Sequence, residues 1–226
     1  MSDSLKRQAA EASLEQVRDG MVLGLGTGST AALMVEALGA RVRAGLRVVG
    51  IPTSERTAAQ ARALGIPLVG FDTHPRIDLT IDGADEVHTG TLDLIKGLGG
   101  ALLREKIVAA ASDRMTVIVD ASKLVPALGR VRLPVEVAVF GADATARHLH
   151  DLGADARLRV VEGVPFRTDG GNLIYDCAFP AIPDAGRLQA RLNAIPGVVE
   201  CGLFVGLATT IIAATPDGLR TLERPA

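Results

Sequence analysis

A lysine, three glycines and a glutamate lie within eleven residues, at 96–106 (KGLGGALLREK). The glycines allow the backbone to approach a ligand closely and to adopt positive φ angles. From residue 101 the apolar spacing predicts a helix, so the loop leads into a helix N-terminus, where free N–H groups attract oxyanions. Lys96 can supply a positive charge and Glu105 a base, which suits a small anionic substrate. The alternative for this run alone is a βα turn with solvated charges.

A second glycine loop, at 24–30 (GLGTGST), follows an apolar run at 21–25 and precedes a predicted helix. Glycines and hydroxyls at a helix N-terminus suit a phosphate group. Dinucleotide binding is disfavoured, because Ser29 stands where a third glycine is needed and no acidic residue ends the next strand. A Walker A loop is excluded, since no Gly-Lys-Ser/Thr occurs. The loop therefore predicts a monophosphate or sugar-hydroxyl site, with a capped tight turn as the alternative.

Three carboxylates lie within the five residues 82–86 (DGADE), after an apolar run at 79–81. They can bind Mg²⁺, accept hydrogen bonds from sugar hydroxyls, or move protons. The absence of a nearby histidine and of regular ligand spacing disfavours the metal. A solvated acidic turn is again the alternative. The hydroxyls of Thr53 and Ser54 end another predicted strand, where a helix N-cap is the favoured interpretation.

The order of the elements that carry these loops predicts an α/β fold with two domains. Strands and helices alternate in the first half, which is typical of a doubly wound, mostly parallel, Rossmann-like sheet. From residue 135 the order becomes βαββαβ, which is typical of a smaller α+β, ferredoxin-like domain. We assign 1–130 and 205–226 to the first domain and 131–204 to the second. The predicted strands are 21–25, 47–51, 67–71, 79–81, 115–119, 135–140, 157–161, 172–178, 198–204 and 209–214; the predicted helices are 31–38, 55–64, 143–152 and 185–195. All the loops described follow strands of the first sheet, so we expect them to meet at its carboxyl edge.

Composition narrows the class of protein. Hydrophobic residues make up 48% of the 226 residues and aromatic residues 3%, so the core must consist of small aliphatic side chains, which suits buried parallel strands. The net charge of −2 does not indicate a nucleic-acid partner. No apolar run approaches the roughly 18 residues that span a membrane, and residues 1–15 lack a signal-peptide core. Cys177 and Cys201 fit no metal spacing, so we expect buried thiols and a cytoplasmic location.

Taken together, these motifs resemble ribose-5-phosphate isomerase, type A. The similar segments are 26–30 (GTGST), 82–86 (DGADE), 96–101 (KGLGGA), 104–106 (REK), 120–123 (DASK), 134–137 (PVEV) and 193–199 (NAIPGVV). They occur in order over nearly the whole chain. Leu98 stands where many members of that family have glycine.

The resemblance implies interconversion of D-ribose 5-phosphate and D-ribulose 5-phosphate, a step of the non-oxidative pentose phosphate pathway, with no metal or organic cofactor. It implies a small-molecule sugar phosphate as ligand, and a homodimer or homotetramer built partly through the smaller domain, with no nucleic-acid or membrane partner. It implies Glu105 as the proton-transferring base. The substrate contacts that it implies are Thr27, Gly28, Ser29, Thr30, Asp82, Gly83, Ala84, Asp85, Lys96, Gly97, Leu98, Gly99 and Lys123.

The chemistry of such an isomerase matches these residue types. The reaction needs a base for one proton, a cation for the developing oxyanion and groups that open the furanose ring. Glu105 and Lys96 fit the first two roles, and Asp82 and Asp85 the third, without the sequence dividing the role between them. Ser29, Thr30 and Lys123 suit the phosphate.

Two other classes stay open at this point. One is a sugar-phosphate-sensing module, as in sugar-responsive transcription regulators, although no DNA-binding segment is visible. The other is a sugar-phosphate deaminase or a coenzyme A transferase relative, in which a carboxylate such as Glu105 would form a thioester.

Overall fold

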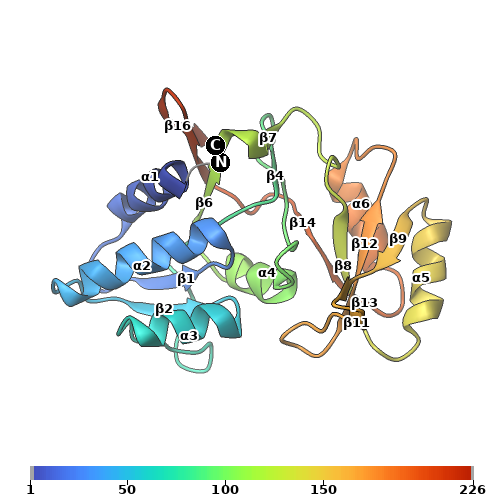
Figure 1. Ribbon diagram of the computed structural model, residues 1–226, viewed down its shortest axis with the longest axis horizontal. Helices are drawn as coiled ribbons and strands as arrows, with labels where there is room; N and C mark the ends of the chain where they lie inside the picture. Colours follow the sequence, from blue (N-terminus) through green and yellow to red (C-terminus); the bar gives the residue numbers. More distant parts are fainter. Residues whose placement is uncertain (1–2, 225–226) are drawn as a thin grey trace. The chain divides into compact units, whose positions relative to one another are not determined.

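The computed structural model describes residues 3–224 and divides them into two units (Figure 1). Unit 1 comprises 3–84, 104–124 and 206–224, and unit 2 comprises 85–103 and 125–205. The expected domains differ from these units by a few residues at 125–130 and 205, and mainly at 85–103, which is expected in the first domain and lies in unit 2. The reason is pairing: β5 (Leu94–Ile95) in this segment joins β4 (Glu86–His88) and β14 (Leu203–Phe204).

Unit 1 is built on a six-stranded sheet in the order β16-β15-β6-β3-β1-β2. All of its neighbouring strands are parallel except β16, which forms a hairpin with β15. The prediction of a doubly wound, mostly parallel sheet is thereby confirmed. The strands are β1 (Val22–Leu25), β2 (Val49–Pro52), β3 (Leu79–Asp82), β6 (Met115–Asp120), β15 (Thr210–Thr215) and β16 (Gly218–Glu223).

Four helices and two short 3₁₀ turns accompany this sheet. They are α1 (Asp3–Ser13), η1 (Leu14–Gln16), α2 (Ser29–Arg43), α3 (Glu55–Ala63), α4 (Leu102–Ala110) and η2 (Ala121–Lys123). Aliphatic side chains of the strands pack against α1 and α2, as the aromatic-poor composition requires. The side chain of Ser54 caps α3 by accepting a hydrogen bond from the Thr57 N–H at 3.1 Å, which confirms the favoured interpretation of that loop.

Unit 2 contains a four-stranded antiparallel sheet in the order β13-β8-β12-β9. Its elements are β8 (Leu133–Val137), α5 (Ala142–Asp151), β9 (Asp155–Leu158), β12 (Leu173–Ala178), α6 (Ala185–Asn193) and β13 (Val198–Cys201). Each strand joined by a helix skips one place in the sheet, which is the split βαβ arrangement of ferredoxin-like domains. Its core is again largely aliphatic.

The structure corrects several predicted elements. Residues 67–71 form no strand, only one bridge between Leu68 and Gly50. The expected strand 198–204 is split at Gly202, because the residues before it pair with β8 and those after it pair with β5, in a different sheet. Two further short pairs were not predicted: β10 (Val160–Val161) with β11 (Val164–Pro165), and β7 (Leu124–Val125) beside β4. Within residues 3–224, no helix has the length and apolar character needed to span a membrane.

Candidate active site

The loops after β1 and β3 are locked together at the carboxyl edge of unit 1. These strands are parallel neighbours, so Gly26 faces the end of β3. The Gly26 N–H donates to the Ile81 carbonyl at 3.0 Å. A Cβ on Gly26 would lie 2.2 Å from Oδ1 of Asp82, far inside van der Waals contact. Only glycine therefore leaves room for the Asp82 carboxylate at this place.

Asp82 is fully buried and accepts two backbone hydrogen bonds through one oxygen. The N–H of Thr27 donates to its Oδ1 at 3.0 Å and the N–H of Gly83 at 2.7 Å. Hydrogen bonds to an ionised acceptor are about twice as strong as neutral ones. Asp82 thus fixes the shape of both loops, with Gly83 and Ala84 following it, partly buried.

A cluster of buried hydroxyl groups forms hydrogen bonds with the first glycine loop. The Thr27 Oγ1 lies 2.7 Å from Thr53 Oγ1, 2.8 Å from Ser54 Oγ and 3.0 Å from Thr57 Oγ1. The Thr57 hydroxyl in turn donates to the carbonyl of Gly26 at 3.0 Å. The side chain of Thr27 is therefore engaged in holding its own loop, and the exposed part of the loop is Gly28–Thr30.

The loop ends at the N-terminus of α2, which begins at Ser29. Gly28 has a φ of +125°, which other residues rarely adopt, so a glycine is required just before the helix. The Lys6 ammonium on α1 donates to the Ser29 hydroxyl at 2.9 Å. A lysine, hydroxyls and a helix N-terminus together make this place favourable for an anion.

Glu105 lies in the second half of the crossover from β3 to β6, on the first turns of α4. Because α4 returns from the carboxyl end of β3, these first turns lie toward the carboxyl edge of the sheet. A Cβ on Gly24 would lie 2.6 Å from Val108 Cγ1, so glycine in β1 lets α4 pack closely. Glu105 is 4% exposed.

Lys123 follows β6 at the same edge of unit 1. It is the last residue of η2, which is capped by the Asp120 side chain accepting from the Ser122 N–H at 2.9 Å. The lysine side chain is partly exposed. The cap fixes the backbone that carries Lys123 and leaves its ammonium able to meet a ligand.

The remaining site candidates belong to unit 2. The N–H of Asp85 donates to the Ile95 carbonyl at 2.8 Å, and its Oδ2 accepts from the Leu98 N–H at 3.0 Å. Lys96 is 2% exposed; its N–H donates to the Gly202 carbonyl at 2.9 Å. The Lys96 ammonium lies 5.5 Å from the centre of the Phe204 ring, a cation–π contact.

The glycine loop that follows Lys96 turns sharply. Gly97 has a φ of +103°, and Leu98 and Gly99 are exposed. Thus the structure brings Thr27, Asp82 and Gly83 into hydrogen-bonding contact in unit 1. It brings Asp85 and Leu98 into contact in unit 2.

Comparison with known proteins decides the family. Residues 49–218 match the family model of ribose 5-phosphate isomerase A (phosphoriboisomerase A). The chain belongs to the ribose 5-phosphate isomerase A family. Its resemblance to this family, predicted from the motifs, is confirmed, and with it the prediction that the chain is an isomerase enzyme.

Relatives of similar length support the assignment. Ribose-5-phosphate isomerase A of Gloeobacter violaceus is 61% identical over 97% of this chain and 96% of its own. That of Rhodopseudomonas palustris is 58% identical over 99% of both chains. The structure of ribose 5-phosphate isomerase A from Methanocaldococcus jannaschii has a TM-score of 0.95 at 42% identity, covering 99% of this chain and 100% of the other.

A further solved relative was determined with a ligand. It is a D-ribose-5-phosphate isomerase in complex with phospho-erythronic acid, with a TM-score of 0.95 and 39% identity, covering 99% of this chain and 100% of its own.

The third carboxylate of the acidic segment, that of Glu86, has a structural role. Glu86 is buried, and its two oxygens accept from the N–H groups of Gly129 and Val131, each at 2.7 Å. It therefore fixes a loop of unit 2. Among the described residues there is no group of three or more His, Cys, Asp or Glu side chains placed to hold a metal ion.

Two residues of the site, Lys6 and Thr57, could not be recognised as site residues from the sequence. Lys6 lies in a polar helix 23 residues before its partner Ser29, so no local spacing connects them. Thr57 lies on the first turn of α3, where a hydroxyl is common for helical reasons alone. Both are brought to the loop by packing of helices on the sheet.

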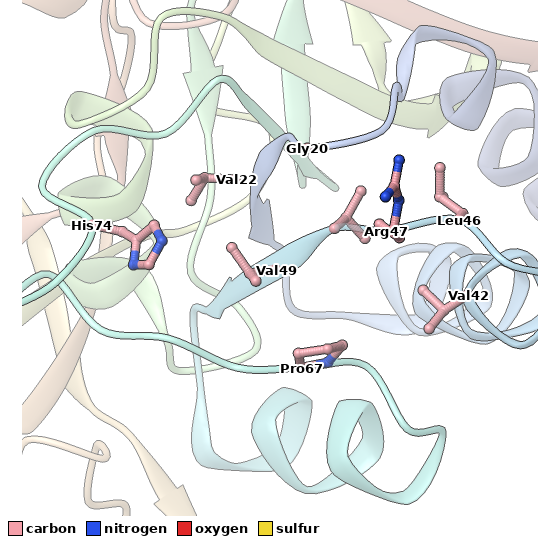
Figure 2. A pocket seen from close by; sticks show the side chains of 9 residues that line it. Gly20, Val22, Val42, Leu46, Arg47, Val49, Pro67 and His74 are labelled. Atoms are coloured by element: carbon pink, nitrogen blue, oxygen red, sulfur yellow. The ribbon is translucent and has the colours of Figure 1, made fainter.

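A cavity of about 410 Å³ also occurs in unit 1, away from this edge (Figure 2). Val22 and Val49, which open β1 and β2, line it together with Pro67, so it lies at the amino ends of the strands. Its Arg47 is paired with Asp19 at 3.0 Å. In open α/β sheets ligands bind at the carboxyl ends, so this cavity is not the candidate active site.

Proposed function

We propose that this chain interconverts D-ribose 5-phosphate and D-ribulose 5-phosphate through an enediolate, with Glu105 as the base. The observation that carries the proposal is the placement of Glu105. It is a buried carboxylate on the first turns of α4, at the carboxyl edge that also carries Gly28–Thr30 and Lys123. A carboxylate shielded from water at the edge where ligands bind in such sheets can serve as a general base.

The proton balance of the reaction can be written around this single base. The Glu105 carboxylate removes the proton from C2 of the open-chain aldose, and the C1 carbonyl oxygen gains negative charge in the enediolate. Glu105 then gives the proton to C1, while a hydroxyl proton moves from O2 to O1. No external oxidant or reductant is consumed.

Lys96 is the proposed stabiliser of the enediolate oxygens, with N–H groups of the loop Gly97–Gly99 other than that of Leu98, which Asp85 accepts. Its burial supports this role, because a charge in a water-poor environment acts more strongly on a developing oxyanion. The ring of Phe204 holds the ammonium without neutralising it.

The phosphate is proposed to bind at the N-terminus of α2, with Ser29, Thr30 and Lys123 as side-chain partners. Lys6 joins this group, because its ammonium already contacts the Ser29 hydroxyl. The helix N-terminus and two lysines oppose a doubly charged phosphate without any metal.

Asp82 and Asp85 are proposed to have different roles, one in fixing the site and the other in binding sugar hydroxyls and opening the ring. Asp82 is fully buried and holds two loops by its Oδ1, so its main role is to fix the site. Asp85 is only partly buried and accepts one hydrogen bond, from Leu98. Asp85 is therefore the proposed group for sugar hydroxyls and for opening the furanose ring.

The oligomeric state is proposed from the family resemblance, and the location from the two cysteines of the sequence. A homodimer or homotetramer is expected by light scattering of the purified protein. A cytoplasmic location is expected by cell fractionation.

Purified protein incubated with ribose 5-phosphate tests the proposed activity. Ketose should accumulate to an equilibrium that is also reached from ribulose 5-phosphate, and EDTA should leave the rate unchanged. Absence of ketose would contradict the function. Loss of activity on chelation, restored by Mg²⁺ or Mn²⁺, would show instead that the acidic segment binds metal.

A further inference from the structure

Arg159 contacts the backbone of the glycine loop that follows Lys96. Its Nη1 donates to the carbonyl oxygens of Gly97 and Leu98, both at 3.1 Å. These residues are about sixty positions apart in sequence but belong to the same unit. One guanidinium nitrogen thus holds two successive peptide groups of the loop.

The guanidinium is itself fixed by the sheet of unit 2. Its Nε donates to Asp176 Oδ2 at 2.9 Å and its Nη2 to Oδ1, a bidentate ion pair, with the Arg159 side chain 12% exposed. The backbone N–H of Arg159 donates to the carbonyl of Ile174 at 2.8 Å, where β9 pairs with β12. The bidentate pair and the low exposure leave the head group little freedom.

Phe166 closes the other side of this contact. The Arg159 guanidinium carbon lies 5.8 Å from the centre of the Phe166 ring. A Cβ on Gly100 would lie 2.4 Å from Cζ of that ring, so the loop backbone runs directly against it. The loop therefore rests on an arginine and an aromatic ring that both belong to the ferredoxin-like unit.

Because the peptide bond is planar, a contact that fixes a carbonyl group also fixes the direction of the N–H group of the next residue. In a trans peptide the C=O and the following N–H point in opposite directions. With the Gly97 carbonyl on Arg159, the Leu98 N–H points away from it and meets Asp85 Oδ2 at 3.0 Å. With the Leu98 carbonyl on the same nitrogen, the N–H of Gly99 also points away from Arg159.

We propose that Arg159 is a positioning residue for the isomerisation: it holds the Leu98 N–H toward Asp85 and sets the direction of the Gly99 N–H, which faces the enediolate. The inference rests on the proposed function, because it assigns a task to a loop that the proposal places against the substrate. The hydrogen bonds from the Arg159 guanidinium to the two carbonyl oxygens also polarise these peptide groups and strengthen their N–H groups as donors. Arg159 itself touches no substrate atom in this scheme.

The test compares Arg159→Met and Arg159→Lys with Arg157→Met. Arg157 lies two residues earlier, on β9, is exposed and pairs with Asp155 at 2.9 Å, so its replacement removes an equal charge from a neighbouring position. We expect kcat to fall about 10- to 100-fold in Arg159→Met, as for a displaced oxyanion donor, with KM changed by less than about threefold. Arg159→Lys keeps a cation and should recover part of kcat, and Arg157→Met should match the wild type.

Two inhibitors separate positioning from a general loss of structure. The carboxylate of phospho-erythronic acid resembles the charge of the enediolate, whereas inorganic phosphate reports on the phosphate site alone. In Arg159→Met the inhibition constant of phospho-erythronic acid should rise about tenfold, in line with the loss in kcat, while that of phosphate changes by less than about twofold.

Three results would overturn the inference. The first is a kcat in both Arg159 variants that lies within about twofold of that of Arg157→Met. The second is an equal rise of both inhibition constants, and the third is a kcat in Arg159→Lys no higher than in Arg159→Met. If Arg159→Met fails to fold, Arg159→Lys decides alone, because it should still bind phospho-erythronic acid several-fold more weakly than the wild type. A wild type that does not convert ribose 5-phosphate contradicts the proposed function, whereas binding of phospho-erythronic acid to the variants still decides the role of Arg159.

Discussion

The backbone N–H of Thr27 donates to Oδ1 of Asp82 at 3.0 Å, across 55 positions of the chain. The same oxygen accepts the N–H of Gly83 at 2.7 Å. One carboxylate oxygen therefore holds the first glycine loop and the acidic segment in a fixed relation. From the motif alone Asp82 would be interpreted as a catalytic residue, but it also stabilises the two loops of the site.

Replacing Asp82 should cost more stability than replacing Asp85. Asp82→Ala leaves the buried N–H of Thr27 and the partly buried N–H of Gly83 without their acceptor, so the free energy of unfolding should fall by about 2–5 kcal/mol. Asp85→Ala removes one bond to an exposed residue, Leu98, and should cost about 1 kcal/mol or less. Urea unfolding of both variants checks this, and equal losses would contradict the structural role of Asp82.

Gly26→Ala should disturb the same contact from the opposite side. The added Cβ would lie 2.2 Å from Asp82 Oδ1 and 2.5 Å from its Cα, so the loop must move. We expect a loss of about 1–3 kcal/mol in the free energy of unfolding, together with reduced kcat. Gly186→Ala is the control: its Cβ would have ordinary contacts at 3.6 and 3.8 Å, and alanine in a helix should stabilise by about 0.5–1 kcal/mol. An unchanged Gly26→Ala would show that the loop has room to spare.

Cys177 should make the protein less stable in alkaline solution. Burial raises the pKa of its thiol to about 12, above the ordinary value of 9.0. Below pH 9 both states keep the proton; above it the unfolded chain loses the proton first, so the free energy of unfolding falls by up to about 1.4 kcal/mol per pH unit until pH 12. Urea unfolding at pH 8 and at pH 10.5 should show a steeper decline for the wild type than for Cys177→Ala. Equal slopes would mean that the folded protein also ionises this thiol.

Local patterns were enough to predict most of the elements that carry the site. Glycines and hydroxyls after an apolar run mark the end of a strand, and this places Gly26 and Asp82 at one edge of the sheet. The βαββαβ order likewise gave the second sheet, since it depends only on consecutive elements.

Contacts made across the fold could not be predicted in this way. Glu86 looks like Asp82 and Asp85 in sequence, yet it holds Gly129 and Val131, more than forty residues later. Nothing near Arg159 in the sequence indicates a contact with the loop at Gly97, because the two segments become adjacent only after folding. The sequence of 85–103 carries no signal for unit 2, because its pairing with β14 involves two residues on each strand, too few for a periodic pattern.

Lys123→Ala should weaken substrate binding more than turnover. A phosphate contact made equally in the ground state and the transition state raises KM when lost and leaves kcat nearly unchanged. Inorganic phosphate should also inhibit the variant less strongly. Arg114→Ala is a matched control, because Arg114 is exposed and precedes β6, at the opposite edge of the sheet from Lys123. Equal KM values in the two variants would place Lys123 outside the phosphate site.

Glu105→Gln is the most direct test of the proposed mechanism. Glutamine keeps the size and polarity of the side chain but has no basic carboxylate, and general-base catalysis is worth about 10²–10⁴-fold, so kcat should fall by at least a hundredfold. The fold should persist, because glutamine suits a helix and creates no cavity in α4. Binding of phospho-erythronic acid should largely survive, since Lys96, Lys123 and both glycine loops remain. Measuring kcat, inhibitor affinity and thermal midpoint side by side separates these effects. A folded variant that keeps more than about a tenth of wild-type kcat would remove Glu105 from the role of base, given that range, and would direct attention to Asp85.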